Sequence, residues 1–504
     1  MTEDMKVDGA SPSRSRQAEI SLDPQDWDAM RRLGHRMVDD LMTYLETVRA
    51  RPAWQRMPDA DKARFQEPLP RTGQAPEAIY QEFVERILPY PIGNIHPRFW
   101  GWVIGTGTPF GMLAEMLAAG MNPNSGGADQ SSTYVERQVL DWCKELFGFP
   151  AEASGLLLTG GSMANLVGMA VARNARAGFD VNAGGLQASS RRVLLYCSVE
   201  THNSVHKAAR LLGLGQAGLR LIPVNEQFEI DLAALQRQLT VDRAEGHRPF
   251  CIIGNAGTVN TGAIDDLARL ADVCARDGVW FHVDGAFGAL AALTSERARL
   301  SGMERADSLA FDLHKWLYMQ YDVGCVLVRH PADHLASFSA PSGYLSRTAG
   351  GVATGGAWFS DFGPELSRCF RALKVWMSIK EHGIDKYAAA IQQNVDPVDA
   401  RRQRSRIEPK QAVGVLASLQ VHFDGVAPDD GLVVQVVPEQ QHLPLDFFTR
   451  TPDEQNSNGI PALAELRLLL GRSRWIVLLE LHLGREHPIH QVWLFDQRRD
   501  ELVQ

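Results

Sequence analysis

The chain has 504 residues, too many for one ordinary hydrophobic core, so two or more packed units are expected. Hydrophobic residues make up 45% and charged residues 22%, which is the balance of a soluble globular protein. The net charge of −9 is spread without clusters of Lys or Arg, which argues against a nucleic-acid partner, and no apolar run approaches the roughly 20 residues of a membrane span.

Residues 1–20 have no apolar core like that of a secretory signal, and we expect a disordered tail. The six cysteines show neither CxxC spacing nor pairing with histidines, which favours reduced thiols in a cytoplasmic protein and no metal site. Residues 21–107 are expected to form a helical segment, with one helix at 23–49 and a second at 78–88. The apolar stripe of the first helix consists of Trp27, Met30, Leu33, Met37 and Leu41.

From residue 155 onwards, short apolar runs alternate with helical stretches. The strand-like runs lie at 155–158, 193–197, 219–224, 251–254, 279–283, 308–311 and 324–328. A helix is predicted at 266–276, between the fourth and the fifth run, because its apolar side chains share one face. This alternation is typical of βαβ units, so we expect a mainly parallel sheet that is covered by helices on both faces.

Four features follow these predicted strands, at the edge where an open α/β sheet binds its ligands. The first is the turn TGGSMAN at 159–165, whose glycines and helix N-terminus suit an anion, although a short motif of this kind is often only a strand-to-helix turn. The second is Asp284, at the end of the run VWFHV. Its carboxylate can pair with a cationic ring nitrogen, or it can cap a helix.

The third feature is Lys315 in the run DLHKW. A lysine at the end of a strand can form a Schiff base with a carbonyl ligand, although most lysines are solvated surface residues. The fourth is His202 in THNSVH, whose ring can stack on a planar ligand or be purely structural. Each feature alone is weak, and their order along the chain is what favours a common ligand site.

In this order the motifs resemble those of the group II decarboxylases that depend on pyridoxal 5′-phosphate (PLP). This is the family of aromatic-L-amino-acid, glutamate and sulfinoalanine decarboxylases. The resemblance runs from about residue 26 to about residue 383 and includes the runs HPRFWGWVIGTGTPFGMLAEML and FRALKVW. It implies an α/β fold of the fold-type I PLP-dependent transferase class, with a large PLP-binding domain at 108–375 and a smaller C-terminal domain at 376–504. After Asn394 the sequence no longer matches the family.

The resemblance implies a role for each candidate residue. Lys315 matches the lysine that carries the cofactor, and Asp284 matches the carboxylate on the pyridine nitrogen. His202 matches the histidine that stacks on the ring, and Ala286 the small residue on the opposite face. The residues expected at the phosphate are Ser162, Met163, Ala164 and Asp312.

Substrate contacts are expected from Trp102, Gly105 and Thr106. Gly105 falls where aromatic decarboxylases carry a threonine near the substrate carboxylate, so Thr106 is the alternative for that contact. Asn124 and Gly126 stand where those enzymes present bulky apolar side chains from the partner subunit, which predicts a roomier or more polar pocket. Trp100 and Trp102 nevertheless offer aromatic surface near the pocket, so an aromatic L-amino acid is the first expectation, and an acidic or other polar amino acid is the alternative.

The reaction implied is the decarboxylation of an L-amino acid to the amine and CO₂ by a homodimer with shared active sites. Tyr344, in the run APSGYLSRT, matches the loop tyrosine of the family and is the candidate for the acid that returns a proton to Cα. The catalytic candidates are thus Lys315, Tyr344, His202 and Asp284. The alternatives are a PLP-dependent aldehyde synthase or aminotransferase, a binding protein without turnover, and a Rossmann oxidoreductase, which the absence of GxGxxG after the first strand disfavours.

Overall fold

The computed structural model describes residues 21–99, 101–340, 348, 350–354, 356–396, 463–470, 474–482 and 497–498. The predicted tail at 1–20 and Tyr344 lie outside these residues. The chain divides into two compact units, Met1–Asp399 and Ala400–Gln504. The expected domain boundary at 375/376 falls inside helix α12 (Arg371–His382) of the first unit, and the domain limits stay a prediction.

Three helices precede the sheet: α1 (Trp27–Glu46), α2 (Asp59–Arg64) and α3 (Pro76–Arg86). α1 begins later than predicted, because the Asp26 carboxylate caps it by accepting hydrogen bonds at 2.9 Å from the N–H groups two and three residues further on. α3 begins at a proline, whose missing N–H is no loss in the first turn of a helix. The Tyr80 hydroxyl of α3 donates to the Asp40 carboxylate of α1 at 2.8 Å, which joins the two helices.

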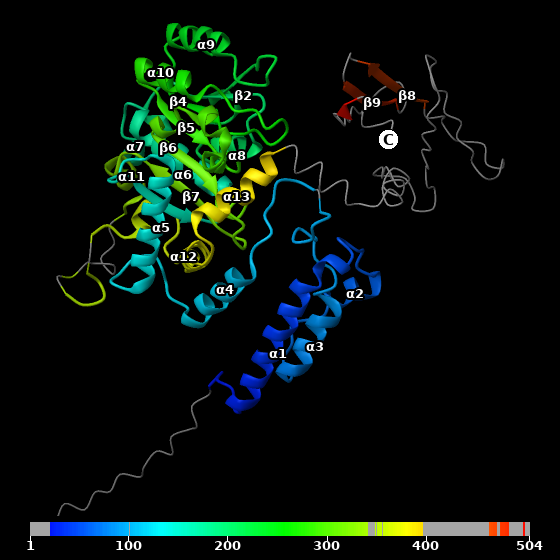
Figure 1. Cartoon of the computed structure of the whole chain (residues 1–504). Coiled ribbons are helices and arrows are strands. Elements are labelled where there is room, and N and C mark those ends of the chain that lie inside the picture. Colours follow the sequence, from blue (N-terminus) through cyan, green and yellow to red (C-terminus); the bar gives the residue numbers. More distant parts are fainter. Residues whose placement is uncertain are drawn as a thin grey trace, which may run out of the picture. The chain divides into compact units, whose positions relative to one another are not determined.

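The seven predicted strands form one sheet in the order β1-β7-β6-β5-β4-β2-β3 (Figure 1). They are β1 (Ser154–Leu158), β2 (Val193–Ser198), β3 (Leu219–Ile222), β4 (Arg248–Asn255), β5 (Trp280–Asp284), β6 (Ser308–Asp312) and β7 (Gly324–Val328). The five strands from β3 to β6 in this order run parallel, whereas β7 is antiparallel to both of its neighbours. Every residue of β2, β5, β6 and β7 is buried, so the expected mainly parallel α/β sheet is confirmed.

Helices connect the strands and cover the sheet (Figure 1). They are α4 (Pro109–Met121), α5 (Ser131–Phe147), α6 (Gly161–Arg176), α7 (Val181–Gly184), α8 (Asn203–Leu211), α9 (Leu232–Ala244), α10 (Leu267–Asp277), α11 (Pro331–Phe338), α12 and α13 (Ile384–Val395). Short 3₁₀ helices lie at Val48–Ala50, Leu186–Ala188, Gln216–Gly218, Gly288–Leu293, Ser295–Leu300, Met303–Arg305 and Phe359–Phe362. α6 begins at the predicted anion turn and packs across β1, β4, β5, β6 and β7, so this helix ties the turn to the centre of the sheet.

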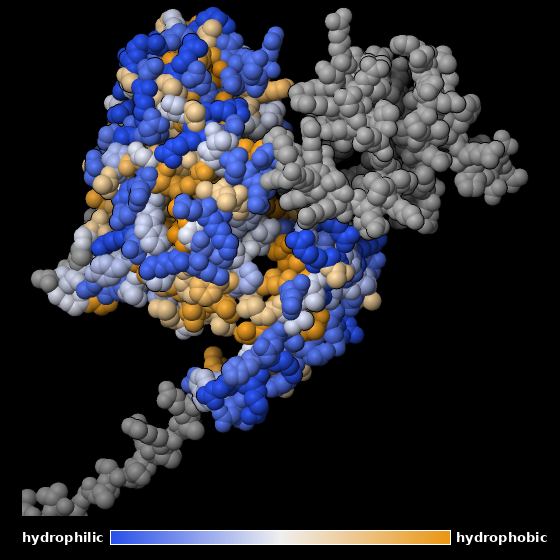
Figure 2. Space-filling view, in the orientation of Figure 1, coloured by the Kyte–Doolittle hydropathy of each residue, from blue (hydrophilic) through white to orange (hydrophobic). Residues whose placement is uncertain are grey.

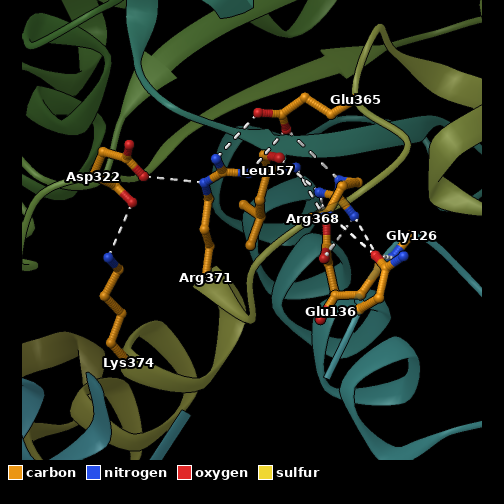
Figure 3. Close-up of polar contacts among 10 residues, drawn as sticks. Gly126, Glu136, Leu157, Asp322, Glu365, Arg368, Arg371 and Lys374 are labelled. Carbon is orange, nitrogen blue, oxygen red and sulfur yellow. Dashed lines mark hydrogen bonds and ion pairs between the residues drawn. The ribbon is translucent and has the colours of Figure 1, made fainter. Parts of the chain in front are cut away.

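The run FRALKVW opens α12 and follows a buried arginine (Figure 3). The guanidinium of this residue, Arg368, pairs with the Glu136 carboxylate of α5 at 2.6 Å. It also donates to the backbone carbonyl oxygens of Ser125 at 2.9 Å and of Leu157 at 2.7 Å. Because Leu157 belongs to β1, which leads into the anion turn, Arg368 fixes the start of α12 to the strand before that turn.

Two further cations of α12 hold the segment that returns from Lys315 to β7 (Figure 3). Arg371 pairs with the Asp322 carboxylate at 3.0 Å and with Glu365 at 2.9 Å. The Lys374 ammonium donates to the Asp322 carbonyl oxygen at 3.0 Å. Both cations are buried, whereas the Asp322 and Glu365 side chains remain 42% and 23% exposed, so these pairs are only partly shielded from solvent.

The second unit is described by three strands, β8 (Leu463–Leu470), β9 (Arg474–His482) and β10 (Gln497–Arg498). They form an antiparallel sheet in the order β10-β9-β8. β8 and β9 pair along the whole of β8, with Leu463 opposite His482 and Leu470 opposite Trp475.

Candidate active site

A cavity of about 280 Å³ lies beyond the carboxyl ends of β4, β5 and β6, where parallel sheets bind ligands. Five of its lining residues are predicted site residues: Trp102, His202, Asp284, Ala286 and Lys315. The other lining residues are Val103, Asn255, Gly257, Thr258, Val259 and Phe287. The fold thus gathers the predicted lysine, carboxylate and histidine around one space.

Asp284 ends β5 and is almost completely buried. One carboxylate oxygen accepts the N–H of Ala286 at 3.1 Å, and the other accepts the side-chain amide of Asn165 at 2.9 Å. Burial raises the pKa of Asp284, and the hydrogen bond from Ala286, the charge of Lys315 and the bond from Asn165 act in the opposite direction. A carboxylate in this position favours a cationic group in the cavity, because a cation would offset the cost of burying its charge.

Lys315 follows β6, and its ammonium reaches the cavity. Its Nζ lies 2.9 Å from Asp312 Oδ2, at the end of the same strand. The preceding His314 is buried, and its Nδ1 accepts the Val323 N–H at 3.0 Å. Burial lowers the pKa of His314, so its ring is favoured in the neutral form and does not compete with Lys315 as a cation.

His202 caps the start of α8. Its Nδ1 accepts the Ser204 N–H at 3.2 Å and lies 2.9 Å from Ser204 Oγ, which fixes the orientation of the ring. The residue remains exposed, but the partial loss of solvent around its ring lowers its pKa. A neutral ring held beside the cavity is suited to stacking on a planar ligand.

The predicted anion turn opens α6. Gly160 has φ +153° and ψ 178°, a conformation that is essentially restricted to glycine. A Cβ at Gly161 would lie 2.8 Å from Asp312 Oδ2, so the turn and the end of β6 approach closely. The N–H groups of Met163 and Ala164 both donate to the Gly160 carbonyl at 3.0 Å. The N–H groups of Gly161 and Ser162 are therefore the ones left as donors for an anion.

Ser162 and Ala164 differ in what they offer to an anion. Ser162 is exposed, and its hydroxyl is a further donor at the start of α6. Ala164 is fully buried, and its methyl group packs in the hydrophobic core. Ala164 therefore supports the turn by packing, and the groups that the turn could offer to an anion are backbone N–H groups and one hydroxyl.

The segment before α4 supplies Trp102 and Val103 to the cavity, whereas Gly105 is packed against backbone. A Cβ at Gly105 would lie 1.9 Å from the His314 carbonyl oxygen, and the Gly105 carbonyl accepts the Asn94 side-chain amide at 2.8 Å. This close approach explains why a threonine does not stand at Gly105. Thr106 is exposed, with its hydroxyl 3.4 Å from the Gly107 carbonyl.

Asn124 and Gly126 have structural roles of their own. The Asn124 side-chain oxygen accepts the N–H groups of Gly126 at 3.0 Å and of Arg368 at 2.9 Å. A Cβ at Gly126 would lie 2.4 Å from the Leu366 carbonyl oxygen. These contacts explain both residue types without reference to a polar substrate.

Asn165 and Asn255 are site residues that the sequence analysis did not single out. Asn255 ends β4 directly opposite Asp284 in the register of the sheet, and its amide donates to Asp265 at 2.8 Å and to Thr201 at 3.0 Å. Asn255 could have been found from its position in the sequence, because a polar residue that ends a buried parallel strand lies at the edge where the sheet binds ligands. Asn165 carried no such signal, since it lies inside a helix.

Neither a metal site nor a membrane span is found in the described part of the chain. Within it, the side chains of His, Cys, Asp and Glu form no group of three or more that could hold a metal ion. Its helices are all too short or too polar to cross a bilayer.

Comparisons with known proteins agree with this geometry. The model of the pyridoxal-dependent decarboxylase conserved domain matches residues 58–423. The aromatic-L-amino-acid decarboxylase of Bacillus atrophaeus is 37% identical over 372 residues, which cover 73% of this chain and 75% of that protein. The crystal structure of Oryza sativa TDC with PLP and tryptamine matches with a TM-score of 0.68 and 26% identity, covering 74% of this chain and 79% of that one. The Rhodiola rosea 4-hydroxyphenylacetaldehyde synthase structure matches with a TM-score of 0.65 and 26% identity, covering 74% and 78%.

The residues of the cavity and of the adjoining start of α6 fit PLP. A Cβ at Gly161 would lie 3.3 Å from the Cβ of Ala286, which lines the cavity, so the N–H groups of this turn are close enough to serve as donors for the phosphate. Lys315 offers an amine for the aldehyde. Asp284 is a buried carboxylate that borders the cavity and gains from a protonated ring nitrogen. His202 and Ala286 both line the cavity, as expected of residues at the two faces of the ring.

Proposed function

The chain belongs to the pyridoxal-dependent decarboxylase family, and we propose that its substrate is an aromatic L-amino acid, which it converts to the corresponding amine and CO₂. The observation that carries this proposal is the apolar wall of the cavity, formed by Trp102, Val103, Val259 and Phe287. Among the described lining residues Lys315 is the only cation, and it is committed to the cofactor. A second carboxylate in the substrate would therefore find no cationic partner among these residues.

Two aromatic side chains shape this wall. The ring of Phe287 is held edge-on to Trp316, with the centroids 5.4 Å apart, and the ring of Trp102 lies 6.2 Å from Phe99. Aromatic rings prefer offset or edge-on partners of this kind, so the wall suits a flat apolar substrate side chain. The relatives whose names specify aromatic amino acids support the same choice.

Bound PLP supplies an electron sink for the pair that remains at Cα when CO₂ leaves. Asp284 holds a proton on the pyridine nitrogen, which that sink requires. Lys315 would anchor the cofactor through its aldehyde, and its amine would be free to move a proton once substrate is bound. Neutral His202, which lines the cavity, would stack on one face of the ring.

Tyr344 is proposed as the acid that donates a proton to Cα after CO₂ has left. It lies outside the described residues, and the assignment rests on its match to the loop tyrosine of the family. A phenol is a suitable acid there because it is neutral at physiological pH and can give up its proton to a carbanion.

The proposal is tested by incubating the purified, PLP-loaded protein with tryptophan, tyrosine, phenylalanine, glutamate and aspartate. Released CO₂ and the organic product are both quantified. We expect equal amounts of CO₂ and aromatic amine. Release of CO₂ from the acidic substrates alone would refute the aromatic assignment, and aldehyde with ammonia in place of amine would indicate an aldehyde synthase.

The proposed assembly is a homodimer. α4 carries Met116, Leu117 and Met121 with about half of each side chain exposed, and Figure 2 shows hydrophobic residues gathered around this helix. On α1, Trp27 and Met37 of the predicted stripe are exposed, whereas Leu33 is buried. Exposed apolar groups of this size mark association surfaces. Light scattering is expected to give twice the chain mass of 55.7 kDa, and a catalytically active monomer would refute the dimer.

The proposed location is the cytoplasm. All six cysteines are free thiols, and five of them are buried. Reduced cysteines are the usual state in that compartment.

A further inference from the structure

Three polar side chains lie on one face of β5 and lead to the cavity. Trp280, His282 and Asp284 alternate with Phe281 and Val283, so they point to the same side of the sheet. Trp280 and His282 are completely buried, and Asp284 is 5% exposed. Buried polar side chains need hydrogen-bond partners, and those of this row form one connected chain.

Both ring nitrogens of His282 are bonded. Nδ1 lies 2.7 Å from Ser308 Oγ, which accepts the Trp280 indole N–H at 2.8 Å. Nε2 lies 2.9 Å from the side-chain oxygen of Asn165. The amide nitrogen of Asn165 donates to Asp284 Oδ2 at 2.9 Å. A continuous chain of hydrogen bonds therefore runs from the indole to the carboxylate at the cavity.

The direction of each bond follows from the two ends of the chain. An indole N–H can only donate, and an ionised carboxylate can only accept. Because Asp284 accepts the Asn165 amide N–H, the Asn165 oxygen accepts the His282 Nε2–H, and in a neutral ring Nδ1 then accepts the Ser308 hydroxyl. Burial lowers the pKa of His282 to about 3, so the ring keeps this neutral tautomer at physiological pH. Every donor in the chain points toward Asp284.

The same amide also reaches the histidine at the cavity. Asn165 donates to Ser204 Oγ at 3.2 Å, and that oxygen lies 2.9 Å from His202 Nδ1. Asn165 is 1% exposed, so water does not compete for these bonds. One buried side chain thus contacts the carboxylate directly and the stacking histidine through a single hydroxyl.

Helix α6 leaves room for the imidazole. A Cβ at Gly168 would lie 2.6 Å from His282 Cε1 and 2.8 Å from Nδ1. Glycine disfavours a helix relative to alanine, so this position departs from helix preference where the ring needs space. The arrangement of His282 against α6 is therefore specified by two elements of the sequence.

We propose that Asn165 is a positioning residue, which keeps Asp284 ionised and aligned for the pyridine nitrogen of PLP, and that His282 sets the orientation of the Asn165 amide. This inference rests on the proposed function, because the ring nitrogen belongs to the cofactor. If the amide turned over, its oxygen would face the Asp284 carboxylate and repel it. The His282 Nε2–H prevents that turn by binding the oxygen on the other side.

The test compares Asn165→Ala, His282→Gln and His282→Leu with the parent enzyme. Each protein is loaded with PLP that carries ¹⁵N in its ring, and the nitrogen chemical shift reports whether the ring nitrogen is protonated. The PLP dissociation constant is measured on the same proteins. For Asn165→Ala we expect a shift toward the unprotonated nitrogen and PLP binding weaker by roughly ten- to a hundredfold, the effect of losing a hydrogen bond to a charged group.

The two substitutions at His282 separate orientation from packing. Gln can present an N–H close to the place of the imidazole Nε2–H, whereas Leu cannot donate. We expect His282→Gln to retain the parent nitrogen shift and His282→Leu to resemble Asn165→Ala. As a matched control, Tyr196→Phe removes a buried hydroxyl bonded to Asp242 at 2.8 Å outside the cavity, and it should leave the nitrogen shift unchanged.

A parent-like shift and affinity in Asn165→Ala would overturn the proposal, as would identical behaviour of the two His282 variants. A parent enzyme that binds no PLP would overturn the proposed function instead. Should the variants fail to fold, ¹⁵N-histidine spectra of the parent protein still test the proposal, because they show which ring nitrogen of His282 carries the proton. They must show His282 protonated on Nε2 and unprotonated on Nδ1, and any other form contradicts the assigned direction of the chain.

Discussion

The Lys315 ammonium lies 2.9 Å from the Asp312 carboxylate, at the end of β6 and beside the strand of Asp284. Asp312 is buried, and its other oxygen lies 3.7 Å from His314 Nε2 without a hydrogen bond among the described residues. The pair holds the amine at the cavity instead of letting it extend into solvent. Two carboxylates therefore end neighbouring strands: Asp312, which contacts the Lys315 amine, and Asp284, which lines the cavity.

Lys315 is predicted to carry PLP. Reduction of the loaded enzyme with borohydride, followed by peptide mapping, should place the label on this residue. Lys315→Ala should lose both the label and the decarboxylation, because no other amine among the described residues lines the cavity. Lys207→Ala, an exposed lysine of α8, is the control and should behave as the parent. A label on another lysine would contradict this assignment.

Tyr344→Phe should impair product formation more than cofactor binding. Loss of a positioned general acid lowers the rate by about 10²–10⁴-fold, so amine formation should collapse. The PLP content should stay near one per subunit, and some aldehyde is expected in the remaining product. Both are measured by absorbance and by mass spectrometry. Amine formation at the parent rate would move the search for the acid to His202.

Much of the site could be predicted because its signals are local in the sequence. A continuous apolar run predicts a buried strand, and residues that end or closely follow it lie at the ligand edge, as for Asp284 and Lys315. The bonds of Asn165 could not be predicted, because its partners His282 and Asp284 lie more than 100 positions away and no periodicity links them. The same holds for Gly105, whose constraint comes from the distant backbone of His314.

The start of α1 at the Asp26 cap and the close backbone contact at Gly105 escaped prediction from the sequence for two different reasons. The start of α1 was misplaced although its cap is a local signal, since apolar periodicity alone does not fix a helix end. The sequence shows a glycine at position 105, where aromatic decarboxylases carry a threonine. The cause of this difference is a backbone contact that only the fold creates. Local rules therefore identify elements and strand ends, whereas close backbone approaches need the structure.

Gly105→Ala should lower kcat/KM while PLP content is retained. The added Cβ would meet the His314 carbonyl oxygen at 1.9 Å, so the segment carrying Trp102 and Val103 must shift away from the cavity. A small displacement of groups that position the substrate can cost on the order of 10²-fold in rate. Gly73→Ala is the matched control, because its Cβ meets nothing within 4 Å. Parent-like kinetics of Gly105→Ala would show that the segment can adapt.

His334 should make the protein less stable as the pH falls below neutrality. It is buried on α11, and burial lowers its pKa from 6.5 to about 3. Between these values the unfolded chain binds a proton that the folded chain does not, so stability is fully present above pH 6.5 and is lost as the pH falls toward 3. The slope is about 1.4 kcal/mol per pH unit for one such histidine.

His334→Leu should remove this part of the pH dependence. Among the described residues the Nε2 of His334 has no well-formed hydrogen bond and only the Phe362 backbone nearby, and Ser154 keeps a contact to the Val328 carbonyl at 3.3 Å when the imidazole is lost. Urea unfolding of parent and variant between pH 7.5 and 5 gives the two slopes. The slopes of the unfolding free energy against pH should differ by the amount expected for the uptake of about one proton. Parallel curves would mean that His334 is protonated in the folded protein.

Glu136→Gln should destabilise the first unit far more than loss of an exposed ion pair. Glu136 is 0% exposed, and it is the carboxylate that balances the buried Arg368 guanidinium at 2.6 Å. Gln keeps the size and one acceptor but removes the charge, and Glu365 is only a weak substitute at 3.9 Å from Arg368 Nε. Breaking a buried pair from one side costs about 3–5 kcal/mol, because the remaining charge is uncompensated.

The control is Glu296→Gln, whose partner Arg299 lies at 3.2 Å with more than half of its side chain exposed, and it should cost less than about 1 kcal/mol. Urea unfolding gives both free energies. Glu136 Oε1 also accepts the Leu157 N–H at 3.3 Å, and Leu157 precedes the anion turn, so Glu136→Gln should weaken PLP binding as well. A loss below 1 kcal/mol, with unchanged PLP affinity, would mean that solvent or Glu365 compensates Arg368 and that the pair does not hold β1 in place.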